Sequence, residues 1–162
     1  MTAASRLALL VEDNEDDVIL LQRTVRKAAL PLTLFHVDDG QRATHYLAGT
    51  GEFSDRARHP LPTLVLLDLK LPLRHGLDIL QWARARRELD PVCIVVLTSS
   101  AEPTDVERAC AYGANCYLTK TVAAETLVEL LAAMDAAWPS AGPGAWLLVP
   151  KAERPRSTPG PA

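Results

Sequence analysis

Short runs of consecutive apolar residues alternate with amphipathic stretches along most of this chain. The runs at 7–11 and 64–67 contain no polar alternation, which is typical of strands buried on both faces inside a parallel sheet. The stretches between such runs repeat apolar residues at helical spacing. The pattern predicts strands at 6–11, 32–37, 63–67, 92–97 and 114–118. It predicts helices at 15–29, 40–48, 76–87, 103–112 and 123–138.

Five strands in strict alternation with five helices predict an α/β fold. We expect a doubly wound, five-stranded parallel sheet with helices on both faces and the flavodoxin-like strand order 2-1-3-4-5. This domain is predicted to span residues 6–138, after an N-terminal tail at 1–5. Half of the prolines lie in 139–162, for which we predict a C-terminal extension without regular structure. The polar loop 49–62 is unusually long and is interpreted as a binding loop or an insertion.

Acidic side chains stand where two of the predicted buried strands end. Glu12 and Asp13 follow the first strand, and Asp68 follows the third. In the expected strand order these two strand ends are neighbours, so the three carboxylates meet at one edge of the sheet. Such a cluster is tolerable only with a cation among the acids, and a hard divalent cation is the natural candidate. Thr98 and Lys120 follow the fourth and fifth strands, and they complete a set of groups suited to phosphoryl chemistry.

Composition excludes several classes of protein. The chain has 162 residues, is 48% hydrophobic and carries a net charge of −3, which suits one globular domain and argues against nucleic-acid binding. No apolar stretch approaches the roughly 18 to 20 residues that a membrane helix needs, and the first apolar run is too short for a signal peptide. The three cysteines lack CxxC spacing and are interpreted as free thiols. We therefore expect a cytoplasmic protein.

Five motifs stand in a fixed order and spacing along the chain: Leu-Val-Glu12-Asp13-Asn, Leu-Leu-Asp68-Leu-Lys-Leu-Pro72, Gly76, Val-Val-Leu-Thr98-Ser and Gly-Ala-Asn-Cys-Tyr117-Leu-Thr-Lys120. In these motifs the chain resembles the receiver domain of two-component response regulators over about 6–138. The resemblance implies a signalling protein that accepts a phosphoryl group from a sensor histidine kinase and is not a metabolic enzyme.

The resemblance implies a role for each matching position around the acids. Asp68 would accept the phosphoryl group as a covalent carboxylate nucleophile. Glu12, Asp13, Asp68 and the backbone carbonyl of Lys70 would hold Mg²⁺. Lys120 would pair with the phosphoryl oxygens as a point charge. Taken alone, Lys120 would be interpreted as a solvated surface charge.

Two further positions match the switch residues of the family. Thr98 would hydrogen-bond to the phosphoryl group after transfer, and Tyr117 would turn inward once Thr98 moves. The surface that changes would comprise the fourth helix, the fifth strand and the fifth helix. From the residues alone, Tyr117 is also consistent with an ordinary core position.

Thr121 departs from the family pattern, because the family usually has a proline after the active-site lysine, joined by a cis peptide. We predict a cis Lys120–Thr121 bond, since the rest of the site pattern is intact. A trans bond would aim the Lys120 side chain differently.

A finer resemblance is to small stand-alone response regulators paired with bacterial and cyanobacterial phytochromes. It is carried by the loop 49–62, the Gly-Ala-Asn-Cys-Tyr string, Trp138 and the late apolar residues 147–150. It implies a light-regulated histidine kinase as partner. It also implies a homodimer through the fourth helix, fifth strand and fifth helix, with residues 146–149 at or near the interface. We expect no nucleic-acid or membrane partner.

Two other functions stay open. A pseudo-receiver would act only as an interaction module, without phosphorylation, although all three acids, Thr98 and Lys120 are retained. A Mg²⁺-dependent phosphohydrolase with an aspartyl nucleophile would want a second acid two residues after Asp68, where Lys70 stands.

Overall fold

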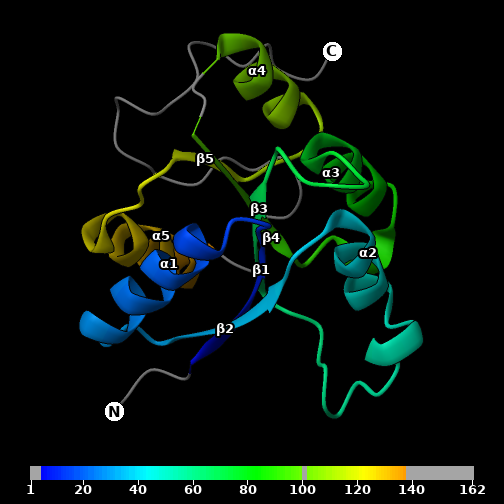
Figure 1. Ribbon diagram of the computed structural model, residues 1–162, viewed down its shortest axis with the longest axis horizontal. Coiled ribbons are helices and arrows are strands. Elements are labelled where there is room, and N and C mark those ends of the chain that lie inside the picture. Colours follow the sequence, from blue (N-terminus) through cyan, green and yellow to red (C-terminus); the bar gives the residue numbers. More distant parts are fainter. Residues whose placement is uncertain (1–4, 100–101, 138–162) are drawn as a thin grey trace.

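The computed structural model describes residues 5–99 and 102–137, which form one parallel sheet flanked by helices (Figure 1). The strands are β1 (Arg6–Val11), β2 (Leu32–Val37), β3 (Leu64–Asp68), β4 (Cys93–Thr98) and β5 (Cys116–Thr119). The helices are α1 (Glu15–Lys27), α2 (Gly40–Ala48), α3 (Gly76–Arg84), α4 (Pro103–Ala111) and α5 (Ala124–Ala137), with short 3₁₀ turns η1 (Gly51–Phe53) and η2 (Arg87–Leu89). The strand order β2-β1-β3-β4-β5 confirms the predicted topology.

Alternate side chains of each central strand enter two separate apolar cores, one on each face of the sheet. Leu10 and Leu66 belong to the core covered by α1 and α5, whereas Leu9 and Leu67 belong to the core covered by α2, α3 and α4. In Figure 1, α1 and α5 accordingly lie together on one side of the sheet. Burial on both faces explains why these strands read as unbroken apolar runs.

The register of the sheet brings the strand ends to a common edge. Val11 pairs with Leu67, so Glu12 follows β1 beside the end of β3. Asp68 pairs with Leu97, one residue before Thr98 ends β4. The fifth strand begins later than predicted, because the Ala114 amide donates to the Ala109 carbonyl at 2.9 Å and so closes α4.

The loop 49–62 is packed against the domain rather than extended from it. The Phe53 side chain is buried. The Arg56 guanidinium donates to the backbone carbonyls of Tyr46, Leu47 and His59 at 2.7 to 3.0 Å. These hydrogen bonds satisfy the carbonyls at the end of α2 and fix the path of the loop.

Some predictions lie outside the described residues. They concern most of the N-terminal tail, Trp138, the extension 139–162 and its apolar segment 146–149. Among the residues that the structure does describe, no helix has the length and apolar character needed to cross a membrane.

Candidate phosphoacceptor site

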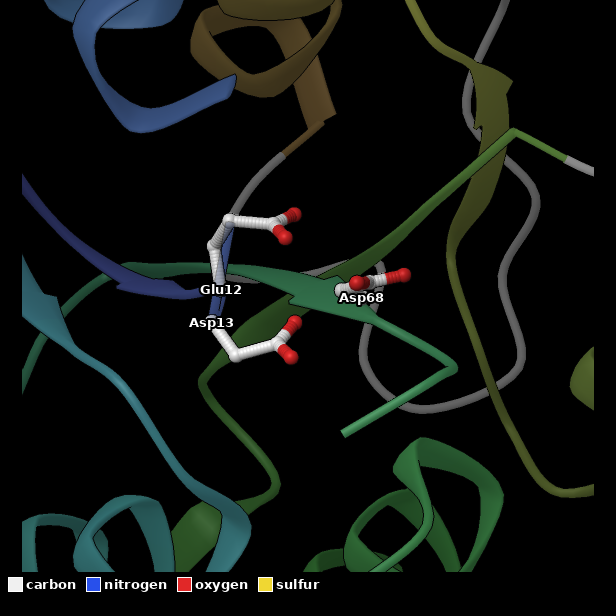
Figure 2. Close-up of side chains that lie close together, drawn as sticks. All are labelled: Glu12, Asp13 and Asp68. Atoms are coloured by element: carbon white, nitrogen blue, oxygen red, sulfur yellow. The ribbon is translucent and has the colours of Figure 1, made fainter. Parts of the chain in front are cut away.

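The three predicted acids converge at the carboxyl edge of β1 and β3 (Figure 2). Glu12 and Asp13 come from the end of β1 and Asp68 from the end of β3. One carboxylate oxygen of each residue lies within 4.8 Å of those of the other two. Glu12 and Asp68 are buried, with exposed fractions of 2% and 5%, whereas Asp13 is exposed. The cluster is therefore open to solvent on the Asp13 side.

The Lys120 ammonium lies among these acids and is not a solvated surface charge. Its Nζ is 2.6 Å from Glu12 Oε2 and 3.3 Å from Asp68 Oδ2. It also donates a hydrogen bond of 2.9 Å to Asp17 Oδ2, a residue of α1. The Lys120 side chain is 15% exposed. Lys120 thus bridges β5, β1, β3 and α1.

Burial and pairing shift the titration of both partners of the shortest contact. Burial raises the pKa of Glu12 to about 7, against the opposing effects of the Lys120 and Asn14 hydrogen bonds. Burial lowers the pKa of Lys120, but its hydrogen bonds to Glu12 and Asp17 outweigh that effect and leave the pKa above its ordinary value. Lys120 is therefore a permanent cation at neutral pH.

Local hydrogen bonds fix the two acids that flank Lys120. Glu12 Oε1 accepts from the Asn14 amide at 3.0 Å, and the Glu12 carbonyl accepts from His36 Nε2 at 2.6 Å. Asp68 Oδ1 accepts from the Lys70 amide at 3.3 Å. The Lys70 backbone thus lies beside the Asp68 carboxylate. The metal role of its carbonyl stays a prediction.

Thr98 and Tyr117 are both buried, at 1% and 2% exposure. Burial raises the pKa of Tyr117 to about 12, and a side-chain hydrogen bond with Thr98 acts in the opposite direction. The predicted switch pair is therefore in direct contact, with the Tyr117 ring packed in the core beneath α4. The peptide bond between Lys120 and Thr121 is cis, which confirms that prediction.

Asp17 is the residue of this site that sequence reasoning missed. It is one of three acids in the first turn of α1, a position that suits the positive end of any helix and does not by itself indicate a site. Its position in the sequence nevertheless indicates which way it faces, because Asp17, Leu21 and Thr24 are spaced four and three residues apart and so lie on one face of α1. All three line a pocket that Lys120 also lines.

The donor set fits a hard divalent cation. Carboxylate oxygens are the ligands that Mg²⁺ prefers, and the ion keeps several waters that an exposed Asp13 leaves room for. The Lys120 ammonium contacts the carboxylates of Glu12, Asp17 and Asp68, and Asp13 adds a fourth carboxylate to the acid cluster. The excess of negative charge favours further cationic charge at this edge.

Comparison with known proteins places these residues in a family context. The model of the response regulator receiver domain matches residues 8–132. Response regulator Rcp1 of Synechocystis sp. is 32% identical over 133 residues, which cover 82% of this chain and 88% of Rcp1. A solved Mn²⁺-bound form of Rcp1 superposes with a TM-score of 0.67 at 30% identity, over 90% of this chain and 99% of that one.

Two other solved structures are similar. The bacteriophytochrome response regulator RtBRR has a TM-score of 0.70 at 36% identity, over 79% of this chain and 76% of that one. The phosphorylated cyanobacterial phytochrome response regulator RcpA has a TM-score of 0.69 at 30% identity, over 89% of this chain and 99% of that one.

Proposed function

This chain belongs to the response regulator receiver family, and from that premise we propose that Asp68 accepts a phosphoryl group from a sensor histidine kinase. The observation that carries the proposal is the position of Lys120, whose ammonium lies 3.3 Å from Asp68 Oδ2 inside a cluster of acids. A cation at that distance can pair with phosphoryl oxygens carried by Asp68.

The transfer exchanges one bond to phosphorus for another. A carboxylate oxygen of Asp68 forms the new P–O bond while the P–N bond of the phosphohistidine breaks. The released imidazole nitrogen takes up a proton. Lys120 supplies positive charge beside the equatorial oxygens of the phosphoryl group. After transfer, the Thr98 hydroxyl donates a hydrogen bond to one of these oxygens.

Mg²⁺ is the metal that we propose for this site, held by Glu12, Asp13, Asp68 and the backbone carbonyl of Lys70. When bound, it offsets the negative charge that the phosphoryl oxygens carry as phosphorus passes between oxygen and nitrogen. The convergence of three carboxylates within 4.8 Å supports this assignment. The related response regulator Rcp1 has a solved Mn²⁺-bound form, which supports a divalent cation in this chain too.

The signal is proposed to leave through the face formed by α4, β5 and α5. Thr98 ends β4, and its side chain is hydrogen-bonded to Tyr117 on β5. When the Thr98 hydroxyl is drawn toward a phosphoryl group on Asp68, it releases this hydrogen bond to the tyrosine. β5 is one of the two edge strands of the sheet, and the same face is proposed as a homodimer interface. Val128 of α5 is a half-exposed apolar residue there.

A phytochrome-linked histidine kinase is the proposed phosphodonor. The similarity to RtBRR and RcpA supports this pairing, since RtBRR is a bacteriophytochrome response regulator and RcpA a cyanobacterial phytochrome response regulator. The test is to measure the rate of phosphotransfer to this chain from a purified phytochrome kinase and from an unrelated histidine kinase. The phytochrome kinase should transfer faster, and equal rates would contradict the pairing. The cytoplasmic location expected from the sequence is consistent with this role and stays a prediction.

Incubation with acetyl phosphate and Mg²⁺, followed by intact-mass measurement, tests phosphoryl acceptance. The wild-type protein should gain the mass of one phosphoryl group, and Asp68→Asn should gain none. Asp38→Asn is the matched control, because Asp38 follows β2 at the same edge and pairs with Arg42 at 3.1 Å instead. Size-exclusion chromatography of the same samples reports whether phosphorylation changes the oligomeric state.

The remaining functions give different results in that experiment. Absence of any adduct in the wild-type protein would favour a pseudo-receiver. Rapid turnover of many phosphoesters would favour a phosphohydrolase. Persistence of the adduct in Asp68→Asn would show that another residue is the acceptor.

A further inference from the structure

We propose that Asp17 is a positioning residue that anchors Lys120 for phosphoryl transfer. This inference rests on the proposed function and adds a residue to it. Asp17 is the third residue of α1, and its Oδ2 accepts a hydrogen bond of 2.9 Å from Lys120 Nζ. The two residues are 103 positions apart in sequence, so the contact exists only because α1 and the end of β5 meet at this edge.

The backbone of Asp17 is itself fixed. Its amide donates to the Asn14 side chain at 3.2 Å, which is the N-cap hydrogen bond of α1. The next residue, Val18, is buried in the core between α1 and α5. The Asp17 carboxylate is therefore presented to Lys120 from a rigid turn rather than from a flexible loop. Its side chain is 33% exposed, so the hydrogen bond is only partly screened by water.

Asp17 differs from the other two partners of Lys120 in what else it does. Glu12 and Asp68 belong to the acid cluster and are proposed to take a metal ion and a phosphoryl group. Asp17 lies outside that cluster, so its carboxylate stays available to Lys120 throughout the transfer. Lysine has three N–H donors on a flexible stem. One donor held by Asp17 leaves the remaining donors for phosphoryl oxygens.

Among the described residues, the pocket beside the pair offers the ammonium no carboxylate other than Asp17 and Glu12, and Glu12 already contacts Lys120. The pocket is lined by Glu12 and Asp17 together with Thr24 and side chains that are largely apolar, among them Leu10, Leu20 and Leu97. Without the Asp17 carboxylate, Lys120 loses its partner on the α1 side. The ammonium then samples more positions, and misplacement of a catalytic group by about 1 Å can cost on the order of 100-fold in rate.

The test compares three variants in the rate of adduct formation from acetyl phosphate. Asp17→Ala removes the acceptor and should slow the reaction about tenfold. Asp17→Asn keeps an acceptor oxygen and should restore most of the rate. Asp16→Ala is the matched control, because Asp16 is an exposed acid of the same helical turn and makes no ion pair among the described residues. It should react like the wild-type protein.

A double-mutant cycle separates anchoring from a general structural effect. If Asp17 acts through Lys120, adding Asp17→Ala to Lys120→Met should slow the reaction no further. Multiplicative losses would overturn the proposal, as would a rate for Asp17→Ala equal to that of Asp16→Ala. Thermal unfolding of each variant shows whether a loss of rate comes from misfolding. If Asp17→Ala is misfolded, the rate of the folded Asp17→Asn variant is compared with the wild-type rate instead.

A second measurement does not depend on phosphorylation. The chain has four lysines, so the ammonium resonances of ¹⁵N-lysine-labelled protein can be assigned with Lys120→Arg. The Lys120 ammonium should give a protected signal in the wild-type protein and in Asp16→Ala, and should lose it in Asp17→Ala. An unchanged signal in Asp17→Ala would overturn the anchoring. If the wild-type protein forms no adduct, the proposed function fails while this signal still decides the anchoring.

Discussion

Two partly buried cations, Arg84 and Lys120, lie at opposite ends of the strands and have different kinds of hydrogen-bond partner. Arg84, the last residue of α3, donates to the Gly113 carbonyl at 3.0 Å, the Leu89 carbonyl at 3.2 Å and Asn115 Oδ1 at 2.7 Å. Every one of these acceptors is neutral. Lys120, at the carboxyl ends of the strands, has three acidic side chains within 3.3 Å.

The contrast separates a structural cation from an exchangeable one. A planar guanidinium bound by fixed carbonyls matches its acceptors in direction and number, and another cation could not replace it. Carboxylates that outnumber their ammonium repel one another and accept any further cation. The Arg84 site therefore stabilises one conformation, whereas the Lys120 site is suited to exchange its partners when metal or phosphoryl group arrives.

Arg84→Met should produce the largest loss of stability. Hydrogen bonds to a charged group contribute about 1.5–3 kcal/mol each, and loss of the guanidinium leaves Asn115 and two carbonyls without this donor. Because Asn115 Oδ1 still accepts from the Ile94 amide at 3.0 Å, we expect a net loss of about 3 kcal/mol in the free energy of unfolding. Urea denaturation measures it.

The control for that variant is Arg87→Met, which changes an exposed arginine three residues further on. It should alter the free energy of unfolding by less than about 0.5 kcal/mol. Folded Arg84→Met should bind Mg²⁺ like the wild-type protein, since Arg84 lies at the other edge of the sheet. A changed Mg²⁺ affinity would mean that the two edges are coupled and would break the comparison.

Lys120→Met should have a smaller effect and of a different kind. A unit charge at about 4 Å interacts with another by about 4 kcal/mol at an effective dielectric constant of 20. In the wild-type protein much of this repulsion between Lys120 and a metal ion is relieved, because the ammonium can give up Glu12 and Asp68 while it stays bound to Asp17. We therefore expect Mg²⁺ to bind about tenfold more tightly to Lys120→Met, a difference of about 1.4 kcal/mol. Isothermal titration calorimetry measures the affinity.

Asp135→Asn serves as the reference for this measurement, because it removes a remote charge that pairs with Arg6 at 2.7 Å. It should leave the Mg²⁺ affinity unchanged. Weaker binding to Lys120→Met would show that the lysine helps to hold the metal site together, and the proposed distinction between the two cations would fail.

The same contrast explains which features could be predicted from the sequence. Strand ends are local features, so the apolar runs located the acids, Thr98 and Lys120, and the parallel order brought them to one edge. The Asp17–Lys120 contact joins residues 103 positions apart, and the Arg84–Asn115 contact joins residues 31 apart. Such contacts depend on side-chain directions that periodicity does not specify, and neither was predicted.

The packing of the loop 49–62 shows the same limit. Its length marked it as unusual, but the arginine that fixes it is one of many polar residues there. Only the fold brings the Arg56 guanidinium to the Tyr46 and Leu47 carbonyls at the end of α2. A polar side chain that satisfies backbone groups cannot be distinguished from a solvated one by its place in the sequence alone.

The smallest expected effect concerns pH and the acid that binds Lys120 most closely. Burial raises the pKa of Glu12 to about 7, so this carboxyl group is largely protonated at pH 6 and largely ionised at pH 8. Protons then compete with Mg²⁺, and the Mg²⁺ affinity should fall severalfold as the pH is lowered through about 7. Glu12→Gln removes the competing proton and should bind weakly, with a flatter profile, whereas Lys120→Met should retain the dependence on pH. The hydrogen-bond acceptors of Arg84 are neutral, so Arg84→Met should leave the pH profile of Mg²⁺ binding unchanged. A changed profile in that variant would show that the pH dependence does not come from the groups around Lys120 alone.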